Sequence, residues 1–200
     1  MTAGFNIRPF TKECLELANN LFEVAVFTAS HKWYADVILD YIDPTNIYFQ
    51  HRLYREHCIK SPDNVYIKDL RIFKNRDLKE VILVDNAVYS FGAQLSNGIP
   101  ITPFKDDKED KEFLHLMQYL ENIASFEDCR ILNSACFKLD LVYKFNVDKF
   151  IDYYSYDIAD EDSGDDEESH DNSQSNLKPL PKSVEDDLSR FGSSLSILMK

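Results

Sequence analysis

Residues 81–86 constrain the fold of this chain more than any other segment. An apolar, mostly β-branched run at 81–84 (VILV) is followed directly by Asp85 and Asn86. A run of this length, closed by two short polar side chains, is typical of a parallel strand that is buried on both faces. In open α/β sheets, ligands bind just beyond the carboxyl ends of such strands. The segment therefore predicts an α/β fold in which Asp85 and Asn86 stand at a ligand-binding edge.

A second apolar segment, residues 22–27, has the pattern of another buried strand and is followed by Thr28 and Ser30. Between the two strands, the short stretch 66–70 holds Lys68 among apolar neighbours. A hydroxyl, a lysine and a carboxylate are components of a metal-assisted phosphoryl-transfer site. The carboxylate nucleophile that would complete such a site is not found in this chain.

A series of short blocks occurs in order between about residue 7 and about residue 123. They are RPF at 8–10, FTAS at 27–30, YAD at 34–36, LDYIDP at 39–44, HRLYREHC at 51–58, YIKDL at 66–70, RDL at 76–78, VDN at 84–86 and NGIPI at 97–101. In these blocks the chain resembles the small C-terminal-domain phosphatases, also called the nuclear-LIM-interactor-interacting-factor family, of the haloacid dehalogenase superfamily. Many ordered blocks at compatible spacing are a far more specific signal than one short motif.

The resemblance implies a haloacid-dehalogenase-like (Rossmann-like) parallel sheet flanked by helices. It also implies an Asp-x-Asp-x-Thr motif after the first strand, whose first aspartate forms an aspartyl-phosphate and whose second acts as general acid and base. This motif is absent from the 200 residues. Residues 160–163 hold two aspartates at the right offset, but no apolar strand precedes them, so we interpret them as part of a solvated tail.

The resemblance implies that the strand preceding this motif is also absent, and the loss of that strand affects the fold. In the haloacid dehalogenase arrangement this strand lies between the strands that end at Thr28 and Asp85. Each buried backbone group left unpaired costs about 1–3 kcal/mol, and several of them compare with a domain's whole stability of about 5–15 kcal/mol. We therefore expect the chain either to be a fragment or to close its sheet across the gap.

The resemblance assigns catalytic roles to Thr28, whose hydroxyl and backbone amide would bind a phosphoryl oxygen, and to Lys68, which would neutralise the phosphate. Each residue also has a purely structural interpretation. Thr28 could cap the helix that begins near residue 31, although Ser30 is the better candidate for that cap. Lys68 could be a surface lysine whose stem lies along apolar neighbours.

The resemblance also makes Asp85 a metal ligand and makes Arg55 and Asn86 contacts for substrate. For Asp85 the structural alternative is an Asx-turn, and for Arg55 it is a solvated pair with Glu56. The implied metal is Mg²⁺, which usually needs one or two carboxylates together with phosphate and several waters. Because the other protein ligands of the family come from the absent motif, we expect Asp85 by itself to hold Mg²⁺ weakly.

Charge and hydropathy limit the partners of the chain. Residues 157–200 carry 12 acidic and 4 basic residues, so they account for −8 of the net charge of −13. The remaining body is mildly acidic and has no basic stripe, which argues against direct nucleic-acid binding. No apolar run approaches the roughly 18 residues that span a bilayer, so no membrane segment is predicted in this chain.

The four cysteines, Cys14, Cys58, Cys129 and Cys136, show neither a C-x-x-C pair nor zinc-ligand spacing with histidine. We expect reduced thiols, which are typical of the nucleus or cytoplasm.

Composition divides the chain into three parts. Residues 1–128 are predicted to form the phosphatase-like domain, and the aromatic-rich residues 129–158 an ordered appendage. Residues 159–200 are acidic and poor in apolar residues, so we predict a disordered tail. Within that tail, residues 184–198 have helical spacing and are predicted to form a short helix that folds on binding a protein partner.

Several helices are predicted inside the phosphatase-like domain, among them one that begins at Pro9 and leads into the 22–27 strand, and two longer segments with clear helical spacing. One of these segments covers residues 31–41, in which Trp33, Val37, Ile38 and Tyr41 recur at helical spacing. The other is an amphipathic helix over residues 108–126.

Two functional interpretations follow. The first is a phosphoprotein serine/threonine phosphatase, acting on phosphoserine or phosphothreonine proteins, whose recorded chain is truncated and inactive as written. The second is a non-catalytic phosphoprotein- or partner-binding module on the same scaffold, like a mitochondrial-import relative of the family that residues 54–58 resemble. Residues 27–30 together with Asp85 and Asn86 favour the first interpretation.

Overall fold

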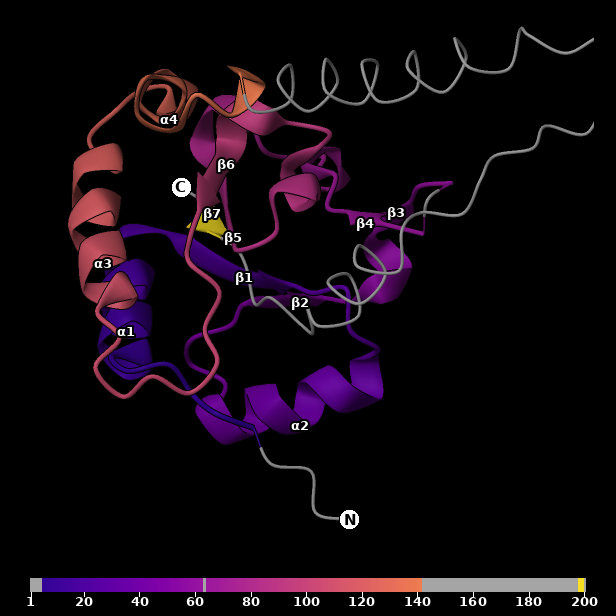
Figure 1. Cartoon of the computed structure of the whole chain (residues 1–200), viewed down its shortest axis with the longest axis vertical. Coiled ribbons are helices and arrows are strands. Elements are labelled where there is room, and N and C mark those ends of the chain that lie inside the picture. Colours follow the sequence, from indigo (N-terminus) through magenta and orange to yellow (C-terminus); the bar gives the residue numbers. More distant parts are fainter. Residues whose placement is uncertain (1–4, 63, 142–197, 200) are drawn as a thin grey trace, which may run out of the picture. The chain divides into compact units, whose positions relative to one another are not determined.

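Two buried strands, β1 (Glu23–Phe27) and β5 (Val81–Asp85), form the centre of the fold. β1 pairs in parallel with β2 (His51–Leu53), and β5 pairs in parallel with β6 (Gly98–Pro100). Every residue of β5 is buried, as the apolar run predicts for a strand covered on both faces. The predicted α/β fold is confirmed (Figure 1).

The computed structural model describes residues 5–62, 64–141 and 198–199. Of these, residues 5–62, 64–139 and 198–199 belong to one compact unit. The last two described residues form a short strand, β7 (Leu198–Met199), which lies between β1 and β5 and is antiparallel to both. The strand order is therefore β2-β1-β7-β5-β6.

This order corrects two expectations. The sheet has not closed across the gap, because β7 keeps β1 and β5 apart and pairs with each of them. Leu198 is a strand residue and not the end of a helix, so the predicted helix at 184–198 is wrong at that position. The rest of that helix, the tail before it and the appendage beyond residue 141 lie outside the described residues.

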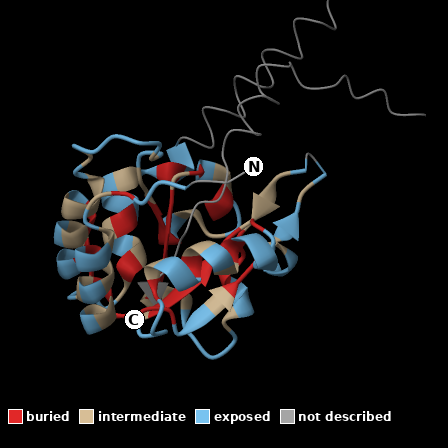
Figure 2. Ribbon diagram, turned by 90° about the horizontal axis from the view of Figure 1, so that it is seen from below, coloured by how far each residue is buried: buried red, intermediate tan, exposed pale blue. Residues whose placement is uncertain are grey.

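Helices cover one face of the sheet, and short turns cover the other. The helices are α1 (Thr11–Leu21), α2 (Lys32–Ile42), α3 (Glu112–Ile123) and α4 (Cys129–Phe137). Alternate residues of β1 point to opposite faces. Val24 and Val26 pack with α1, α2 and α3, whereas Ala25 and Phe27 pack with Leu70 and Phe91 on the other side. In Figure 2 the buried strands lie inside, and the helices turn their exposed sides outward.

The remaining elements are short. A hairpin pairs β3 (Ile59–Lys60) with β4 (Tyr66–Ile67) in antiparallel fashion. Five 3₁₀ turns connect the strands, at Arg55–His57, Leu70–Ile72, Leu78–Glu80, Val88–Phe91 and Leu95–Asn97. No helix within the described residues is long and apolar enough to cross a membrane.

The helix predicted at 31–41 is present as α2, but its buried side differs from the residues that suggested it. Its buried residues are Ala35 and Leu39. Trp33, Val37 and Tyr41 are 73%, 66% and 68% exposed. α2 has more apolar residues than one helix face can bury, so sequence spacing alone does not identify the face that meets the sheet.

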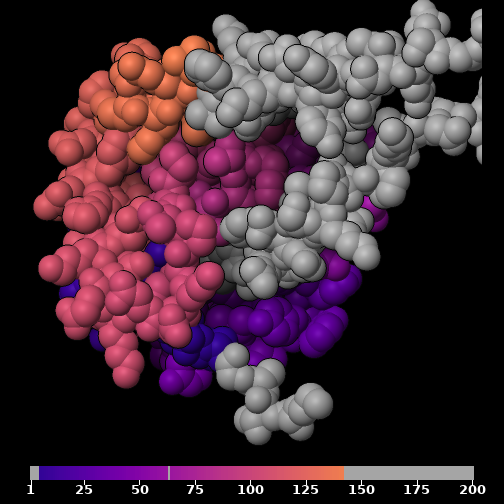
Figure 3. Space-filling view, in the orientation of Figure 1, coloured from indigo at the N-terminus to yellow at the C-terminus, as the bar shows by residue number. Residues whose placement is uncertain are grey.

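The predicted domain boundary at residue 128 is also corrected. α4 begins with Cys129, which is buried and whose thiol lies 3.3 Å from the Val81 carbonyl. From α3, the Tyr119 hydroxyl donates to Asn133 at 2.8 Å. The space-filling view shows α4 directly against the end of α3 (Figure 3). Because of these contacts, α4 is part of the same compact unit as the sheet, which extends to residue 139.

Asp43, at the end of α2, organises the loop that leads into β2. Its fully buried carboxylate accepts hydrogen bonds from the backbone amides of Ile47 at 2.9 Å, Tyr48 at 2.8 Å and Phe49 at 3.1 Å. Each of these amides needs a partner once it is removed from water. A single side chain thereby fixes the route of the chain from α2 to the edge of the sheet.

We predict that Asp43→Ala lowers the free energy of unfolding by roughly 3 kcal/mol, because it leaves several amide donors unpaired. The measurement is urea unfolding followed by circular dichroism. The matched control is Asp40→Ala on the same helix, which removes only a partly solvated pair with Arg52 at 2.6 Å and should cost at most about 1 kcal/mol. Equal losses for the two variants would contradict this role of Asp43.

Candidate functional site

The candidate site is centred on a buried ion pair at the carboxyl end of β5. The Lys68 ammonium lies 2.5 Å from Oδ2 of Asp85, and the two residues are 1% and 0% exposed. Lys68 is therefore not a surface lysine lying along apolar neighbours, and that alternative is wrong. Asp85 Oδ1 accepts the backbone amide of Ala87 at 2.8 Å, so the carboxylate forms an Asx-turn and an ion pair at the same time.

Local structure explains how Lys68 reaches this position. The β3–β4 hairpin ends at Ile67, and the Lys68 backbone amide then donates to the Ser90 carbonyl at 3.1 Å. Asp69 follows and caps the next turn by accepting the amide of Arg71 at 3.0 Å. The Arg71 guanidinium holds the pKa of Asp69 down at about 2. Anchored on both sides, the Lys68 side chain is directed inward to Asp85.

Thr28 stands at the end of β1, on the same edge of the sheet. β1 and β5 are both antiparallel to β7, so their carboxyl ends lie on one side. The Thr28 amide already donates to the Leu53 carbonyl at 2.9 Å, and its hydroxyl oxygen accepts the Ser30 amide at 3.1 Å. The amide is thus not available for a phosphoryl oxygen, contrary to our expectation, whereas the hydroxyl proton is still free to be directed at one.

The structural alternative for this loop is also corrected. His31 precedes α2 as its cap residue, and no side chain caps the helix there. Neither Ser30 nor Thr28 performs that function, because the Thr28 hydroxyl bonds the Ser30 amide inside the loop. The Thr28–Ser30 contact instead shapes the turn between β1 and α2.

Arg55 is held against this turn. Its Nε donates to the Ala29 carbonyl at 2.5 Å, Nη1 lies 2.9 Å from His31 Nε2, and the guanidinium stacks over the Tyr66 ring at 5.0 Å. A solvated pair with Glu56 does not describe this geometry. Arg55 therefore places a positive charge beside the end of β1.

Cys58 lies beside Thr28, although no sequence motif marked it as a site residue. Its thiol lies 3.8 Å from the Thr28 carbonyl. Burial raises the pKa of Cys58 to about 11, while the charges of Lys68 and Arg55 oppose that shift. A thiol with so high a pKa is not a nucleophile at neutral pH.

Tyr66 and Tyr89 are further residues that the sequence did not indicate. Tyr66 supplies the ring beneath Arg55, and burial together with the Asp85 charge raises the pKa of Tyr89. Both residues come from segments that are too short to show a periodic pattern. A search for aromatic residues within two positions of the lysine would have found Tyr66.

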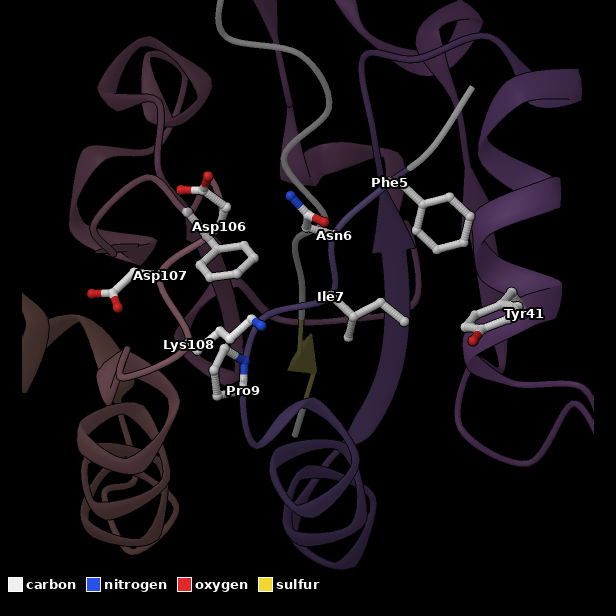
Figure 4. Close-up of a pocket in the computed structure, with 9 residues that line it drawn as sticks. Phe5, Asn6, Ile7, Pro9, Tyr41, Asp106, Asp107 and Lys108 are labelled. Carbon is white, nitrogen blue, oxygen red and sulfur yellow. The ribbon is translucent and has the colours of Figure 1, made fainter. Parts of the chain in front are cut away.

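Asn86 lines a surface hollow, whereas Lys68 is buried and does not line it. This hollow measures about 320 Å³ and is lined also by Tyr34 and Ile38 of α2 and by Ile101 after β6. A larger hollow of about 550 Å³ lies next to residues 5–9, Tyr41 and the 104–108 loop (Figure 4). Lys68 and Asp85 line neither hollow, so the buried ion pair and the open cavities are separate features.

Within the described residues, no group of three or more His, Cys, Asp or Glu side chains is placed to hold a metal ion. Asp85 supplies one carboxylate, and that carboxylate is bound to Lys68 and Ala87. An Mg²⁺ ion needs further oxygen ligands in near-octahedral geometry. These residues by themselves therefore do not fit the ion that the resemblance implies.

Comparison with known proteins gives a consistent picture. The family described as NLI interacting factor-like phosphatase matches residues 1–130. "CTD small phosphatase-like protein 2" of Dictyostelium discoideum is 46% identical over 123 residues, which are 62% of this chain and 21% of that protein. "CTD small phosphatase-like protein 3" of Caenorhabditis elegans is 39% identical over 150 residues, which are 74% of this chain and 49% of that protein.

A relative with a different kind of name also matches. "Mitochondrial import inner membrane translocase subunit TIM50" of Candida glabrata is 36% identical over 141 residues, covering 69% of this chain and 28% of that protein. The chain spans about half or less of the length of these three relatives.

Among solved structures, "The Structure of Fcp1, an essential RNA polymerase II CTD phosphatase" matches with a TM-score of 0.52. It is 19% identical and covers 60% of this chain and 46% of that chain. At this identity the similarity shows the fold alone.

We predict that Lys68 and Asp85 are strongly coupled in the stability of the fold. Lys68→Met or Asp85→Asn should each lower the free energy of unfolding by about 3–5 kcal/mol, because each change leaves the other group buried without its partner. The double variant should lose much less than the sum of the two single losses. Urea unfolding of the four proteins completes the cycle.

The control is Lys12→Met, which removes an exposed pair with Glu16 at 3.7 Å and should cost at most about 1 kcal/mol. Additive losses in the cycle would show that the contact between Lys68 and Asp85 does not stabilise the fold.

Proposed function

The chain belongs to the NLI interacting factor-like phosphatase family, and we propose that its scaffold is that of a phosphoprotein serine/threonine phosphatase of the C-terminal-domain type. The observation that carries the proposal is the buried pair of Lys68 and Asp85 at the carboxyl edge of the sheet. A buried, paired lysine and carboxylate at that edge, in a protein of this family, is an arrangement suited to phosphoryl transfer.

Three residues are proposed to act on the phosphoryl group and its surroundings. Lys68 supplies a positive charge that neutralises the developing charge on phosphate oxygens. The Thr28 hydroxyl, held by the Ser30 amide, donates to one of those oxygens. Asp85 holds the Lys68 side chain in place through the buried ion pair at 2.5 Å. All three stand on elements anchored by backbone hydrogen bonds, which gives the site a fixed geometry.

Arg55 and Asn86 are proposed to bind the protein substrate around the phosphate. Arg55 adds a second positive charge beside the end of β1, fixed by Ala29 and Tyr66. Asn86 reaches into the hollow next to α2, where the rest of a substrate chain could lie. A phosphoserine or phosphothreonine protein is the substrate class that fits the family.

Phosphatases of this type are in general dependent on Mg²⁺. The described residues do not fit the ion by themselves, and we therefore expect no tight Mg²⁺ binding by the 200-residue chain. The Asp-x-Asp-x-Thr motif is absent from these residues, and no described side chain takes the place of its first aspartate. We propose that the 200-residue polypeptide by itself does not hydrolyse phosphate esters.

A second candidate function is a non-catalytic phosphoprotein- or partner-binding module. Two observations favour it. β7 occupies the space between β1 and β5 with residues that carry no carboxylate, and a relative named as a mitochondrial import subunit shares this family's sequence. Lys68 and Arg55 would then serve as an anion-binding pair without turnover. The nucleus or cytoplasm stays our prediction for its location.

We predict no Mg²⁺-dependent turnover of an aryl phosphate by the 200-residue chain. A form that carries an Asp-x-Asp-x-Thr strand in the same reading frame should be active. In that form, Lys68→Ala and Asp85→Ala should each lower turnover by roughly 10²- to 10³-fold, because they remove electrostatic stabilisation of the transition state. The measurement is product release with Mg²⁺ and with a chelator.

Lys12→Ala, on the exposed side of α1, is the control and should leave turnover unchanged. Turnover by the 200-residue chain that disappears in Asp85→Ala would contradict the proposed inactivity. A near-normal rate of Lys68→Ala in the longer form would contradict the role of Lys68. Binding of a phosphopeptide by the 200-residue chain, without turnover in either form, would favour the second candidate.

A further inference from the structure

Arg55 is held by three groups that come from three different parts of the chain. Its Nε donates to the Ala29 carbonyl at 2.5 Å, and its Nη1 lies 2.9 Å from Nε2 of His31. Its Cζ lies 5.0 Å from the centre of the Tyr66 ring, over the face of that ring. A guanidinium is planar and rigid, so contacts at two of its nitrogens and over one of its faces fix its orientation.

The contact with Arg55 also determines which form of the His31 imidazole is present. The nitrogens of an arginine side chain are donors only, and the side chain keeps its proton in proteins. Nε2 of His31 must therefore be the acceptor of this hydrogen bond. The imidazole is then neutral and carries its proton on Nδ1, because a protonated imidazole has no acceptor nitrogen.

The position of this acceptor is fixed by α2. The His31 carbonyl accepts the backbone amides of Tyr34 at 3.1 Å and Ala35 at 3.0 Å, so the backbone of His31 belongs to the start of the helix. The ring of Trp33 is nearly parallel to the imidazole, with an interplanar angle of 11° and 6.4 Å between the ring centres. The His31 side chain does not cap the helix and is directed to Arg55 instead.

These contacts leave Nη2 of Arg55 for a ligand. Among the residues that the structure describes, none accepts a hydrogen bond from Nη2. Because the guanidinium is held at Nε and Nη1, the direction of the Nη2 donors is fixed as well. A guanidinium binds phosphate oxygens through such directed N–H donors.

We propose that His31 is a positioning residue for Arg55. By accepting from Nη1, Nε2 of His31 fixes the plane of the guanidinium, so that Nη2 meets an oxygen of a phosphoserine or phosphothreonine without first having to order the arginine side chain. A donor that is ordered in advance binds more tightly, because less conformational entropy is lost on binding. The identity of the anion rests on the proposed function, whereas the contact between the two side chains does not.

Two substitutions of His31 separate this role from a structural one. The amide oxygen of His31→Gln reaches the position of Nε2, whereas that of His31→Asn reaches only the position of Nδ1. Asparagine is a good N-cap residue, so His31→Asn leaves α2 intact and removes only the acceptor for Arg55. His115→Asn is the matched control, because His115 lies exposed on α3.

Heteronuclear NMR of the 200-residue chain at neutral pH tests the contact itself. We expect the His31 proton on Nδ1 and an order parameter of about 0.85 for the Arg55 Nε–H bond, the value of a rigid group. His31→Asn should lower that order parameter toward about 0.6. His31→Gln and His115→Asn should leave it unchanged.

Titration with free phosphoserine, followed by the Arg55 Nε–H signal, tests the consequence for binding. His31→Asn should weaken binding by roughly 3- to 10-fold, which corresponds to one hydrogen bond. His31→Gln should restore the affinity of the original chain, and His115→Asn should keep it. Because His31 acts through Arg55, His31→Asn should cause no further loss when Arg55→Lys is already present.

A proton on Nε2 of neutral His31 would overturn the proposal. Equal losses in His31→Gln and His31→Asn would also overturn it, as would a further loss on top of Arg55→Lys. If the original chain binds no phosphoserine, the proposed function fails, and the position of the His31 proton and the order parameters of Arg55 still decide whether His31 positions Arg55.

Discussion

The peptide groups of two buried strands, β1 and β5, need hydrogen-bond partners along both edges, and the rest of the structure is arranged around this need. β2 and β6 satisfy the outer edges in parallel register. Between the strands, β7 pairs with the first two residues of β1 and with the first two residues of β5. Helices and turns then cover both faces of the sheet, and water cannot replace any partner that is missing. The sheet therefore depends on a segment that is very distant in sequence.

The ion pair of Lys68 and Asp85 lies at the carboxyl end of β5, which borders the same gap. Burial of two charges costs several kcal/mol per ion, and their attraction offsets that cost only when the geometry is good. A well-packed apolar pair in the place of a buried ion pair often gives equal or greater stability, so the presence of a lysine and an aspartate here agrees with the proposed role in phosphoryl transfer. Cys58, whose thiol lies 3.8 Å from the Thr28 carbonyl, has its pKa raised to about 11 by burial and adds no competing nucleophile.

The sequence predicted those parts of the fold that are encoded by long, uninterrupted apolar runs within a single segment of the chain. β1 and β5 follow from uninterrupted apolar runs, and Asp85 follows from its place at the end of one of them. β7 could not be predicted, because two residues show no period and their partners lie more than a hundred positions away. The partners of Arg55 were missed for a similar reason, since the β3–β4 hairpin brings Tyr66 beneath it.

The direction of the strand between β1 and β5 determines which residues are brought to the candidate site, whereas a strand of either direction can pair with the sheet. A parallel strand in the gap would end at the edge where Thr28 and Asp85 lie, and it would deliver the residues that follow it to Lys68. The described strand β7 is antiparallel, and its residues Leu198 and Met199 pair at the amino ends of β1 and β5, away from that edge. Neither residue has a carboxylate. β7 thus satisfies hydrogen bonds of the sheet without bringing a nucleophile to the site, so a folded scaffold with an intact ion pair does not by itself imply an active enzyme.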